Sequence, residues 1–230
     1  AMIINIGWRQ SVFGVYGKAG YTWRFIPNKR IEYLKLEKIV DPILLFKEWL
    51  SEAEKKEIRD PNAMQLATVS KNGMPSVRTV LLKDIINGDF VFYTNYESRK
   101  SEEINETAKG AICFYWKSLN RQVRLVGSIQ KVSDEISDEY YQSRSKGSRI
   151  GAWASKQSKE LESREVLMEE VKLFEAKYND EIPRPSFWGG FALKPIEFEF
   201  WEDGDFRLHD RFILRPTKIK NEWIAKRHYP

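Results

Sequence analysis

Cysteine, histidine and long apolar runs are scarce in this sequence of 230 residues. It has one cysteine and two histidines, which excludes an intramolecular disulfide and a metal site built from several thiolates. Cys113 lies in the apolar run 111–116 and is predicted to be a small buried residue in a reducing compartment. Neither a membrane-spanning run nor a secretory signal is evident, so we expect a soluble, cytoplasmic protein without a membrane partner.

The common catalytic signatures are also missing. The sequence has no Gly-rich phosphate-binding loop of standard spacing, no His-Glu-x-x-His and no Gly-x-Ser-x-Gly. Its only imidazoles belong to His209 and His228. These absences disfavour a metalloenzyme and a triad hydrolase, and we predict no metal site.

The excess positive charge is concentrated near the N-terminus. The formal net charge is +5, and residues 1–40 hold seven Lys or Arg against two Glu, which leaves 31 residues of each sign in the remainder. A balanced body lacks the basic surface that nucleic acids select, so we expect no nucleic-acid partner. Residues 1–40 show no steady periodicity. We predict an N-terminal arm or lid there, partly mobile, and one domain over residues 41–230.

The body of the chain predicts an antiparallel β structure with flanking helices. Asp41 and Pro42 are typical of a helix start, and the amphipathic pattern continues to about Ile58. Short apolar runs then alternate with turns that contain Gly and Asn, as in hairpin-linked strands. Strands are predicted at residues 64–69, 77–85, 90–95, 111–117, 122–132, 191–202, 208–214 and 223–226. Further helices are predicted at residues 98–107, 133–145 and 161–178. This α+β pattern, mainly β, favours a closed or nearly closed antiparallel barrel.

Cationic side chains stand at the ends of two predicted strands. Arg78 and Lys83 are five residues apart, so the alternation of side chains sends them to opposite faces unless a bulge or twist intervenes. They either bind anions or are ordinary charges at strand ends. Ser98, Arg99 and Lys100 open a helix, where free backbone N–H groups and the helix dipole favour a phosphate. A simple helix cap is the alternative.

Polar groups in the middle of the chain are spaced to meet a ligand. Tyr140 and Arg144 are one helical turn apart and Ser148 follows, so their side chains can converge on one phosphate. Ordinary surface polarity is the alternative. Gln122 lies in a strand and needs a partner, either a heterocycle or neighbouring backbone. Residues 150–158 are small and polar, which indicates a loop that contacts a ligand or a second subunit.

A third group of candidate ligand-binding side chains lies towards the C-terminus. On a strand, Arg207, His209 and Arg211 would share one face with no carboxylate between them. Trp201 places an aromatic ring nearby. We interpret this face as ligand-binding, with an exposed charged stripe as the alternative.

Seven motifs in order make the chain from about Asp41 to Trp223 resemble the pyridoxine (pyridoxamine) 5′-phosphate oxidases, an FMN-dependent family of the split-barrel flavoprotein fold. The motifs are RTVLLK at 78–83, FYTN at 92–95, SRK at 98–100, RQVR at 121–124, GAWASKQS at 151–158, PSFWGG at 185–190, and EFW with RLHDRF within 199–212. The resemblance implies a split antiparallel β-barrel of the FMN-binding type over residues 41–230. It also implies a homodimer with FMN sites at the interface.

The resemblance further implies which residues form the site. FMN would contact Arg78, Thr79, Val80, Leu81, Leu82, Lys83, Tyr93, Thr94, Arg99, Lys100, Gln122, Gln157, Ser158, Trp201 and Arg211. Gln157 and Ser158 would reach across from the other subunit. The substrate would contact Lys83, Tyr140, Arg144, Ser148, Arg207, Leu208 and His209, and Arg30 and Tyr33 would belong to an N-terminal lid. Arg207 and His209 are the implied catalytic residues, which hold the pyridine ring against the flavin.

The implied reaction is the oxidation of pyridoxamine 5′-phosphate or pyridoxine 5′-phosphate to pyridoxal 5′-phosphate, with O2 as electron acceptor and H2O2 as by-product. The flavin carries the redox chemistry, so no catalytic carboxylate pair is needed. A flavin- or pyridoxal-phosphate-binding protein with little or no turnover is the alternative. Family members commonly end in Arg-Leu-x-Pro. This chain ends in Arg227-His228-Tyr229-Pro230, so we expect different packing near the ring site.

Overall fold

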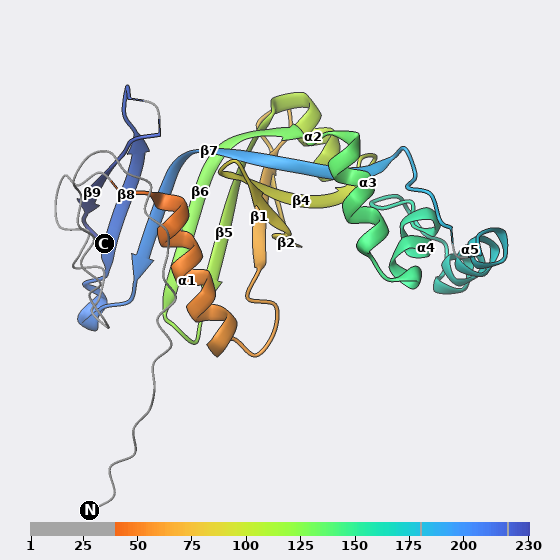
Figure 1. The fold of residues 1–230 in the computed structure, drawn as a ribbon, viewed down its shortest axis with the longest axis horizontal. Coiled ribbons are helices and arrows are strands. Elements are labelled where there is room, and N and C mark those ends of the chain that lie inside the picture. Colours follow the sequence, from red (N-terminus) through yellow and green to blue (C-terminus); the bar gives the residue numbers. More distant parts are fainter. Residues whose placement is uncertain (1–39, 180, 220) are drawn as a thin grey trace, which may run out of the picture. The chain divides into compact units, whose positions relative to one another are not determined.

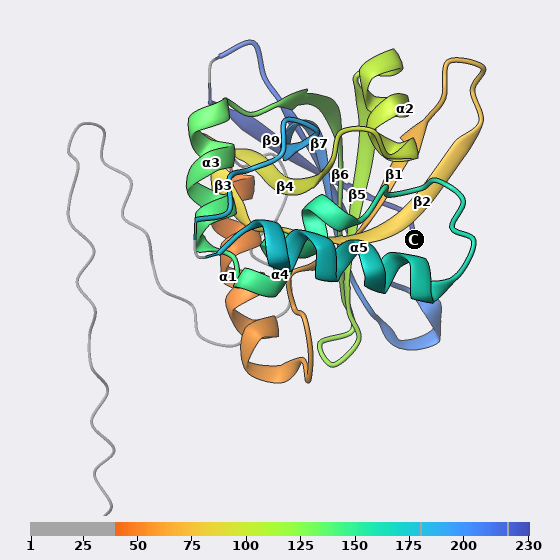
Figure 2. The same cartoon turned by 90° about the vertical axis from the view of Figure 1, so that its right-hand side faces the viewer.

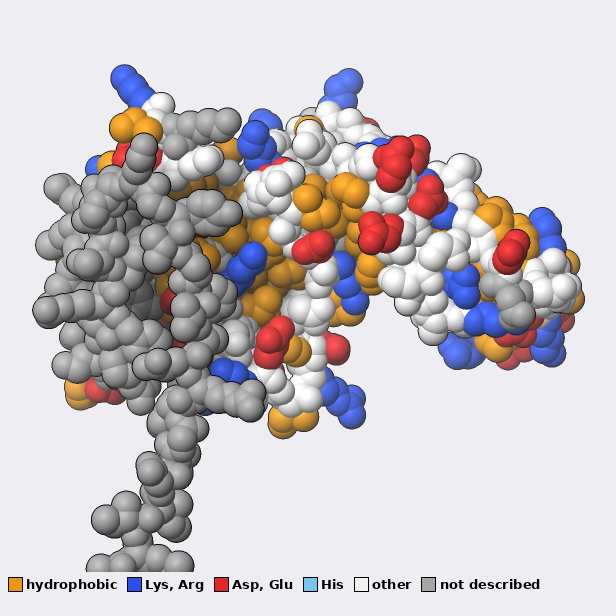
Figure 3. All heavy atoms as spheres, in the orientation of Figure 1, with side chains coloured by type: hydrophobic (Ala, Val, Ile, Leu, Met, Phe, Trp, Pro, Cys, Tyr) orange, Lys and Arg blue, Asp and Glu red, His pale blue; other side chains and the backbone are white. Residues whose placement is uncertain are grey.

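The computed structural model describes residues 40–179, 181–219 and 221–230. The predicted arm, with Arg30 and Tyr33, lies outside the described residues except for Val40. No helix in the described part is long and apolar enough to cross a membrane. Acidic and basic side chains are interspersed on the face shown in Figure 3, in keeping with the balanced charge of the body.

The described chain forms five α-helices, one short 3-10 turn and nine strands (Figure 1). The helices are α1 (Pro42–Lys56), α2 (Arg99–Thr107), α3 (Asp134–Ser143), α4 (Lys146–Ala154) and α5 (Arg164–Lys177). The strands are β1 (Ala63–Val69), β2 (Pro75–Leu81), β3 (Asp84–Ile86), β4 (Asp89–Asn95), β5 (Lys109–Trp116), β6 (Arg121–Lys131), β7 (Trp188–Glu202), β8 (Asp210–Pro216) and β9 (Trp223–His228). The 3-10 turn η2 (Asp205–Arg207) joins β7 to β8.

One long strand organises the sheet. The order is β2-β1-β5-β6-β7-β4-β3, and β8 pairs with β7 and β9 with β8. The first part of β7 pairs with β4, its last part pairs with β8, and a bulge beside Gly127 separates the two parts in the β6–β7 ladder. Strand β7 is thus shared between β4 on one side of the bulge and β8 on the other, and the barrel is split there. This confirms the predicted split antiparallel fold with flanking helices.

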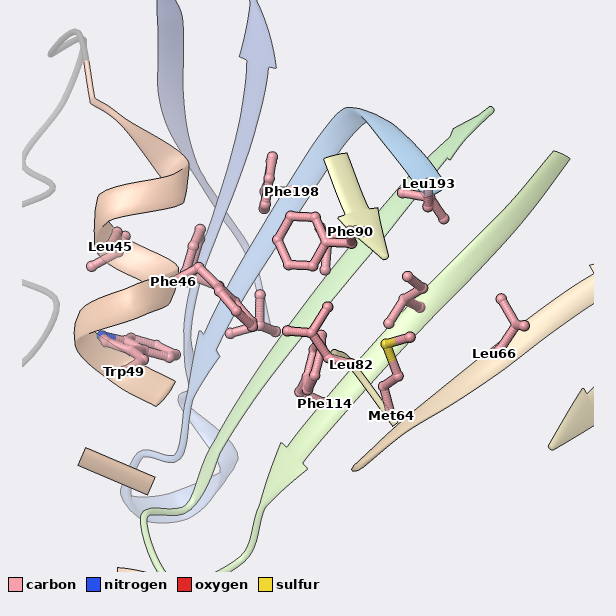
Figure 4. Close-up of a cluster of buried hydrophobic side chains, with 14 of the residues drawn as sticks. Leu45, Phe46, Trp49, Met64, Leu66, Leu82, Phe90, Phe114, Leu193 and Phe198 are labelled. Atoms are coloured by element: carbon pink, nitrogen blue, oxygen red, sulfur yellow. The ribbon is translucent and has the colours of Figure 1, made fainter. Parts of the chain in front are cut away.

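Helix α1 closes the core at one side of the barrel. The Asp41 carboxylate accepts hydrogen bonds from the backbone N–H groups of Ile43 and Leu44, and Pro42 follows it, as the sequence predicts for the helix start. Phe46 is fully buried and its ring centroid lies 4.9 Å from that of Phe90 (Figure 4). Aromatic packing of this kind fixes the helix against the sheet.

Three predicted elements differ in the structure. The predicted strand 77–85 is two strands, β2 and β3, with a break at residues 82–83. The predicted loop 150–158 is in part helical, because α4 extends to Ala154 from a start at Lys146, where the Ser145 side chain caps it by accepting from the Ser148 N–H. The predicted strand 208–214 begins only at Asp210, because residues 205–207 form a 3-10 turn in which Phe206 and Arg207 have positive φ.

Candidate functional site

A cavity of about 910 Å³ lies at the end of the sheet that carries α3, α4 and α5, the end that faces the viewer in Figure 2. Its walls come from β2, β4, the end of α3, the beginnings of α2, α4 and β7, and the segment after α4. This volume is typical of a site for a small ligand or cofactor. Five cationic side chains line it, namely Arg78, Lys83, Arg99, Lys100 and Arg144.

The break between β2 and β3 brings Arg78 and Lys83 to the same cavity. The Lys83 N–H bonds to the Val91 carbonyl, while Leu82 turns into the core. The odd spacing therefore does not send the two cations to opposite faces, because the alternation of a continuous strand does not extend through residue 82. Of the predicted FMN segment 78–83, every residue except Leu82 lines the cavity.

Lys100 is a buried cation whose described partners are all uncharged. Its Nζ donates to Thr94 Oγ1 at 3.1 Å, Ser98 Oγ at 3.0 Å and Gln157 Oε1 at 2.7 Å. Burial, with a smaller contribution from the charge of Arg78, lowers the pKa of Lys100 to about 8. A buried ammonium group that has no carboxylate partner among residues 40–179, 181–219 and 221–230, at the start of α2 and beside two guanidinium groups, suits a phosphate. The donor set of the cavity therefore fits the phosphate of a cofactor such as FMN.

A second anion site lies where α3 meets α4. Tyr140, Arg144 and Ser148 all line the cavity, as their predicted convergence requires. The Arg144 guanidinium lies 4.5 Å above the Trp188 ring, and its buried Nη1 has no hydrogen-bond partner among the described residues. An unpaired buried N–H group costs stability unless a ligand accepts from it. The arrangement is therefore suited to a second anionic group.

Stacked aromatic rings connect the two anion sites. The Tyr93 and Tyr140 rings are 3.8 Å apart and nearly parallel, and Trp188 stacks 5.6 Å from Tyr93. Gly190 permits this packing, because a Cβ there would lie 2.9 Å from Tyr93 Cε1 and 2.6 Å from Val132 Cγ2. The sequence-based site did not include Trp188, although it lies within the motif at residues 185–190.

The expectation that Gln157 and Ser158 reach across from another subunit is wrong in this structure. Both residues line the cavity of their own chain. Gln157 Oε1 accepts from Thr94 Oγ1 at 2.9 Å as well as from Lys100. The short segment after α4 folds back over α2, so no second chain is needed to bring these residues to the cavity.

The remaining predicted flavin residues form a separate row on the sheet. Gln122 is the register partner of Trp201, and Trp201 is the register partner of Arg211. Directly paired residues share a sheet face, so these three form one surface, here called the β6–β8 row. None of the three lines the cavity. Strand β8 lies at one end of the sheet and α4 at the other (Figure 1).

The Arg207 and His209 region differs from its prediction. Arg207 lies in the 3-10 turn and His209 precedes β8, so only Arg211 stands on a strand. Carboxylates do accompany this group, because His209 Nδ1 lies 2.9 Å from Asp203 Oδ1 and Arg211 Nη2 donates to Glu199 Oε2 at 2.8 Å. Glu199 lies in β7 and Asp203 directly follows that strand, so residues 207–211 alone do not reveal these partners. Leu208 is 71% exposed, and neither Arg207, Leu208 nor His209 lines the cavity.

Cys113 is half-buried rather than fully buried. Its side chain lies on the face of the sheet opposite the fully buried Phe114, and its register partner is Arg124. Burial is the main reason that the pKa of its thiol is raised.

The structure adds a buried network that the sequence-based site did not contain. The carboxylate of Glu103 on α2 accepts from Arg99 Nε at 2.9 Å and from Ser76 Oγ at 2.5 Å, and it also accepts from Thr68. The four-residue spacing of Arg99 and Glu103 on a helix is the signal that predicts part of it.

A split barrel with a cation-lined cavity defines this chain as a small-ligand-binding protein of the split-barrel class. Residues 50–178 match the family described as pyridoxamine 5′-phosphate oxidase, and residues 188–230 match the pyridoxine 5′-phosphate oxidase C-terminal dimerisation region. The chain belongs to the pyridoxamine 5′-phosphate oxidase family, which confirms the resemblance found in its motifs. Membership of this family indicates that the chain binds a flavin.

Individual relatives agree with this assignment. A pyridoxine/pyridoxamine 5′-phosphate oxidase of Brucella canis is 55% identical over 191 residues, which cover 83% of this chain and 94% of that protein. The crystal structure of PhzG from Burkholderia lata, in complex with tetrahydrophenazine-1-carboxylic acid, aligns with a TM-score of 0.80 at 30% identity, over 89% of this chain and 99% of that one. An FMN-binding protein of Nostoc punctiforme shares the fold with a TM-score of 0.68 at 19% identity, over 83% of this chain and 99% of that one.

Proposed function

We propose that this protein is an FMN-dependent oxidase that converts pyridoxamine 5′-phosphate or pyridoxine 5′-phosphate to pyridoxal 5′-phosphate, with O2 as acceptor and H2O2 as by-product. The observation that carries the proposal is the pairing of two anion sites in one cavity, in a chain 55% identical to a curated oxidase of this name. A phosphorylated cofactor and a phosphorylated substrate need two such sites. We place the reaction in the cytoplasm.

Within the cavity, each anion site is assigned one phosphate. Arg78, Arg99 and Lys100 would hold the phosphate of FMN, with Thr94 and Gln157 beside it. Tyr140, Arg144 and Ser148 would hold the substrate phosphate, with Lys83 as a further cation on the wall of the same cavity. Bound FMN supplies the redox chemistry by taking two electrons from the substrate and passing them to O2.

The cavity of one chain does not contain all of the residues predicted to contact the flavin and the substrate ring. Gln122, Trp201, Arg207, His209 and Arg211 are predicted site residues that lie outside it. We propose that a second copy of the chain supplies them, so that the active site forms at the interface of a homodimer. The match of residues 188–230 to a dimerisation region supports this arrangement.

The roles of these residues follow from their chemistry. Arg211, held by Glu199, would face the flavin as a positive charge, and a nearby cation stabilises the reduced, anionic flavin. Arg207 would cover the substrate ring, and His209 would make a polar contact with it. Their function is to orient the C4′ carbon towards the flavin.

A ring with a carboxylate, like the ligand of the Burkholderia lata structure, is the alternative substrate for the second anion site. The higher identity to the Brucella canis oxidase favours the vitamin B6 substrates. A phosphate also accepts more hydrogen bonds than a carboxylate, in keeping with the three polar side chains gathered there.

Anaerobic reduction tests the proposal. The purified protein should be yellow, and its flavin absorbance should bleach when pyridoxamine 5′-phosphate is added without O2 and return when O2 is admitted. A yellow protein that does not bleach would support a flavin-binding protein without turnover. A colourless protein that does not take up FMN would contradict the proposal altogether.

A further inference from the structure

Behind two of the cations that line the cavity, Arg78 and Arg99, lies a buried negative charge. Glu103 is 4% exposed and lies on α2, one turn after Arg99. Burial alone would raise the pKa of its carboxyl group, but hydrogen bonds from Ser76, Thr68 and Arg99 and the charge of Arg78 lower that pKa to about 2. Glu103 therefore stays ionised throughout the physiological pH range.

Glu103 is linked to both arginines that line the phosphate site. Its Oε1 accepts directly from Arg99 Nε at 2.9 Å, and its Oε2 lies 3.5 Å from Arg78 Nη2. The stronger link to Arg78 passes through two hydroxyl groups. Thr68 and Ser76 both donate to Glu103 and both accept from the Arg78 guanidinium. Strands β1 and β2 and helix α2 are thereby joined around one carboxylate.

This network leaves donors available to a ligand. The bond to Glu103 uses only Nε of Arg99, so its two terminal nitrogens have no partner in the described part of the chain. Arg78 uses Nη1 and Nη2 for Leu66, Thr68, Ser76 and Glu103, which leaves its Nε–H group without a partner there. Both residues line the cavity. A fixed guanidinium loses less conformational entropy when it binds a phosphate.

We propose that Glu103 is a positioning residue for the cofactor phosphate, which it serves by holding Arg78 and Arg99 in their binding orientation. The inference rests on the proposed function, because it assigns the phosphate of FMN to this site. Glu103 itself would not touch the phosphate. As a negative charge beside an anion site, it would weaken phosphate binding if it acted through its charge alone.

Replacement of Glu103 by glutamine distinguishes the positioning of Arg78 and Arg99 from the direct effect of the negative charge on phosphate binding. Glu103→Gln keeps the size of the side chain and removes its charge. If positioning dominates, the affinity of the apoprotein for FMN falls by about tenfold or more, as expected when charge-assisted hydrogen bonds lose their geometry. If only the charge matters, FMN binds more tightly. Titration with riboflavin, which lacks the phosphate, should give the same affinity in variant and wild type, within about twofold.

The measurement is flavin fluorescence quenching, with FMN and riboflavin titrated separately into each apoprotein. Glu102→Gln is the matched control, because Glu102 is the neighbouring residue on α2 and its side chain is 57% exposed. It should change neither affinity. Ser76→Ala tests the hydroxyl link independently of charge, and should lower FMN affinity selectively even if Glu103→Gln does not fold.

Three results would overturn the inference. They are unchanged or tighter FMN binding by Glu103→Gln, equal losses for FMN and riboflavin, and an FMN affinity of Ser76→Ala equal to that of wild type. Failure of the wild-type protein itself to bind FMN would instead contradict the proposed function.

Discussion

Lys100 and Gln157 are joined by a hydrogen bond of 2.7 Å although they are 57 residues apart in the sequence. The bond connects the start of α2 to the segment that follows α4, and both residues line the cavity. Gln157 has an amide oxygen to offer the lysine but no negative charge. Within the part of the chain that the structure describes, Lys100 therefore has no compensating negative charge until an anion binds.

This environment predicts a pH dependence of FMN binding. The pKa of Lys100 is lowered from 10.5 to about 8, so its charge is lost from the apoprotein as the pH rises through about 8. FMN affinity should then decrease from pH 8 to 9.5, with uptake of a proton on binding. Riboflavin affinity should stay level over the same range. Fluorescence titrations at each pH measure both, and a level FMN affinity would contradict the assignment of Lys100.

The lowered pKa of Lys100 also predicts that the stability of the apoprotein depends on pH. Between pH 8 and 10.5 the unfolded chain binds more protons at Lys100 than the folded chain does. The contribution of Lys100 to the free energy of unfolding should therefore rise with pH in this window. Urea denaturation of the wild type and of Lys100→Met should show this difference, because the variant lacks the titrating group.

Arg144 is expected to determine selectivity for phosphorylated substrate. In Arg144→Met the thioether can still pack on Trp188, but the charge and the unpaired N–H group are lost. KM for pyridoxamine 5′-phosphate should rise by about tenfold or more, the expected effect of a lost charge-assisted hydrogen bond. FMN content and the rate with unphosphorylated pyridoxamine should change little. Equal losses with both substrates would show that Arg144 does not read the phosphate.

Helix α1 provides a test of the fold that does not involve the site. Phe46→Ala removes a fully buried ring that packs on Phe90 and Phe114, and should lower the free energy of unfolding by about 3–5 kcal/mol. Leu44 lies on the same helix and is 56% exposed, so Leu44→Ala should change it by less than about 0.5 kcal/mol. Urea denaturation of the apoproteins gives both values, and similar losses would contradict the assigned core.

The sequence predicts the fold and the types of residue in the site better than it predicts which of these residues lie together in space. Periodicity locates α1 and most strands, because alternating apolar residues are a local signal. It sends Arg78 and Lys83 to opposite faces unless a bulge or twist intervenes, and it cannot detect the break at Leu82, which depends on pairing with β4. Glu103 also escapes prediction, since its link to Thr68 and Ser76 forms only when strands β1 and β2 pack against α2.

The division of the site between cavity and β6–β8 row also depends on tertiary structure. The motifs predict both Gln157 and Trp201 as FMN contacts, although Gln157 lines the cavity and Trp201 does not. His228 is a second example. The sequence alone shows that it replaces the leucine of the Arg-Leu-x-Pro ending that is common in the family. Its register partner is Arg211, and only this pairing places it beside the β6–β8 row.

Complementation between two defective chains tests the central claim most directly. The claim is that each active site combines the cavity of one subunit with Arg207 and the β6–β8 row of the other. Lys100→Met damages the cavity and Arg207→Ala damages the facing group, so each homodimer should have little activity. A heterodimer isolated from co-expressed, differently tagged chains would have one intact site of two, and should show about half of the wild-type oxidase rate. A heterodimer no more active than its parent homodimers would contradict the claim.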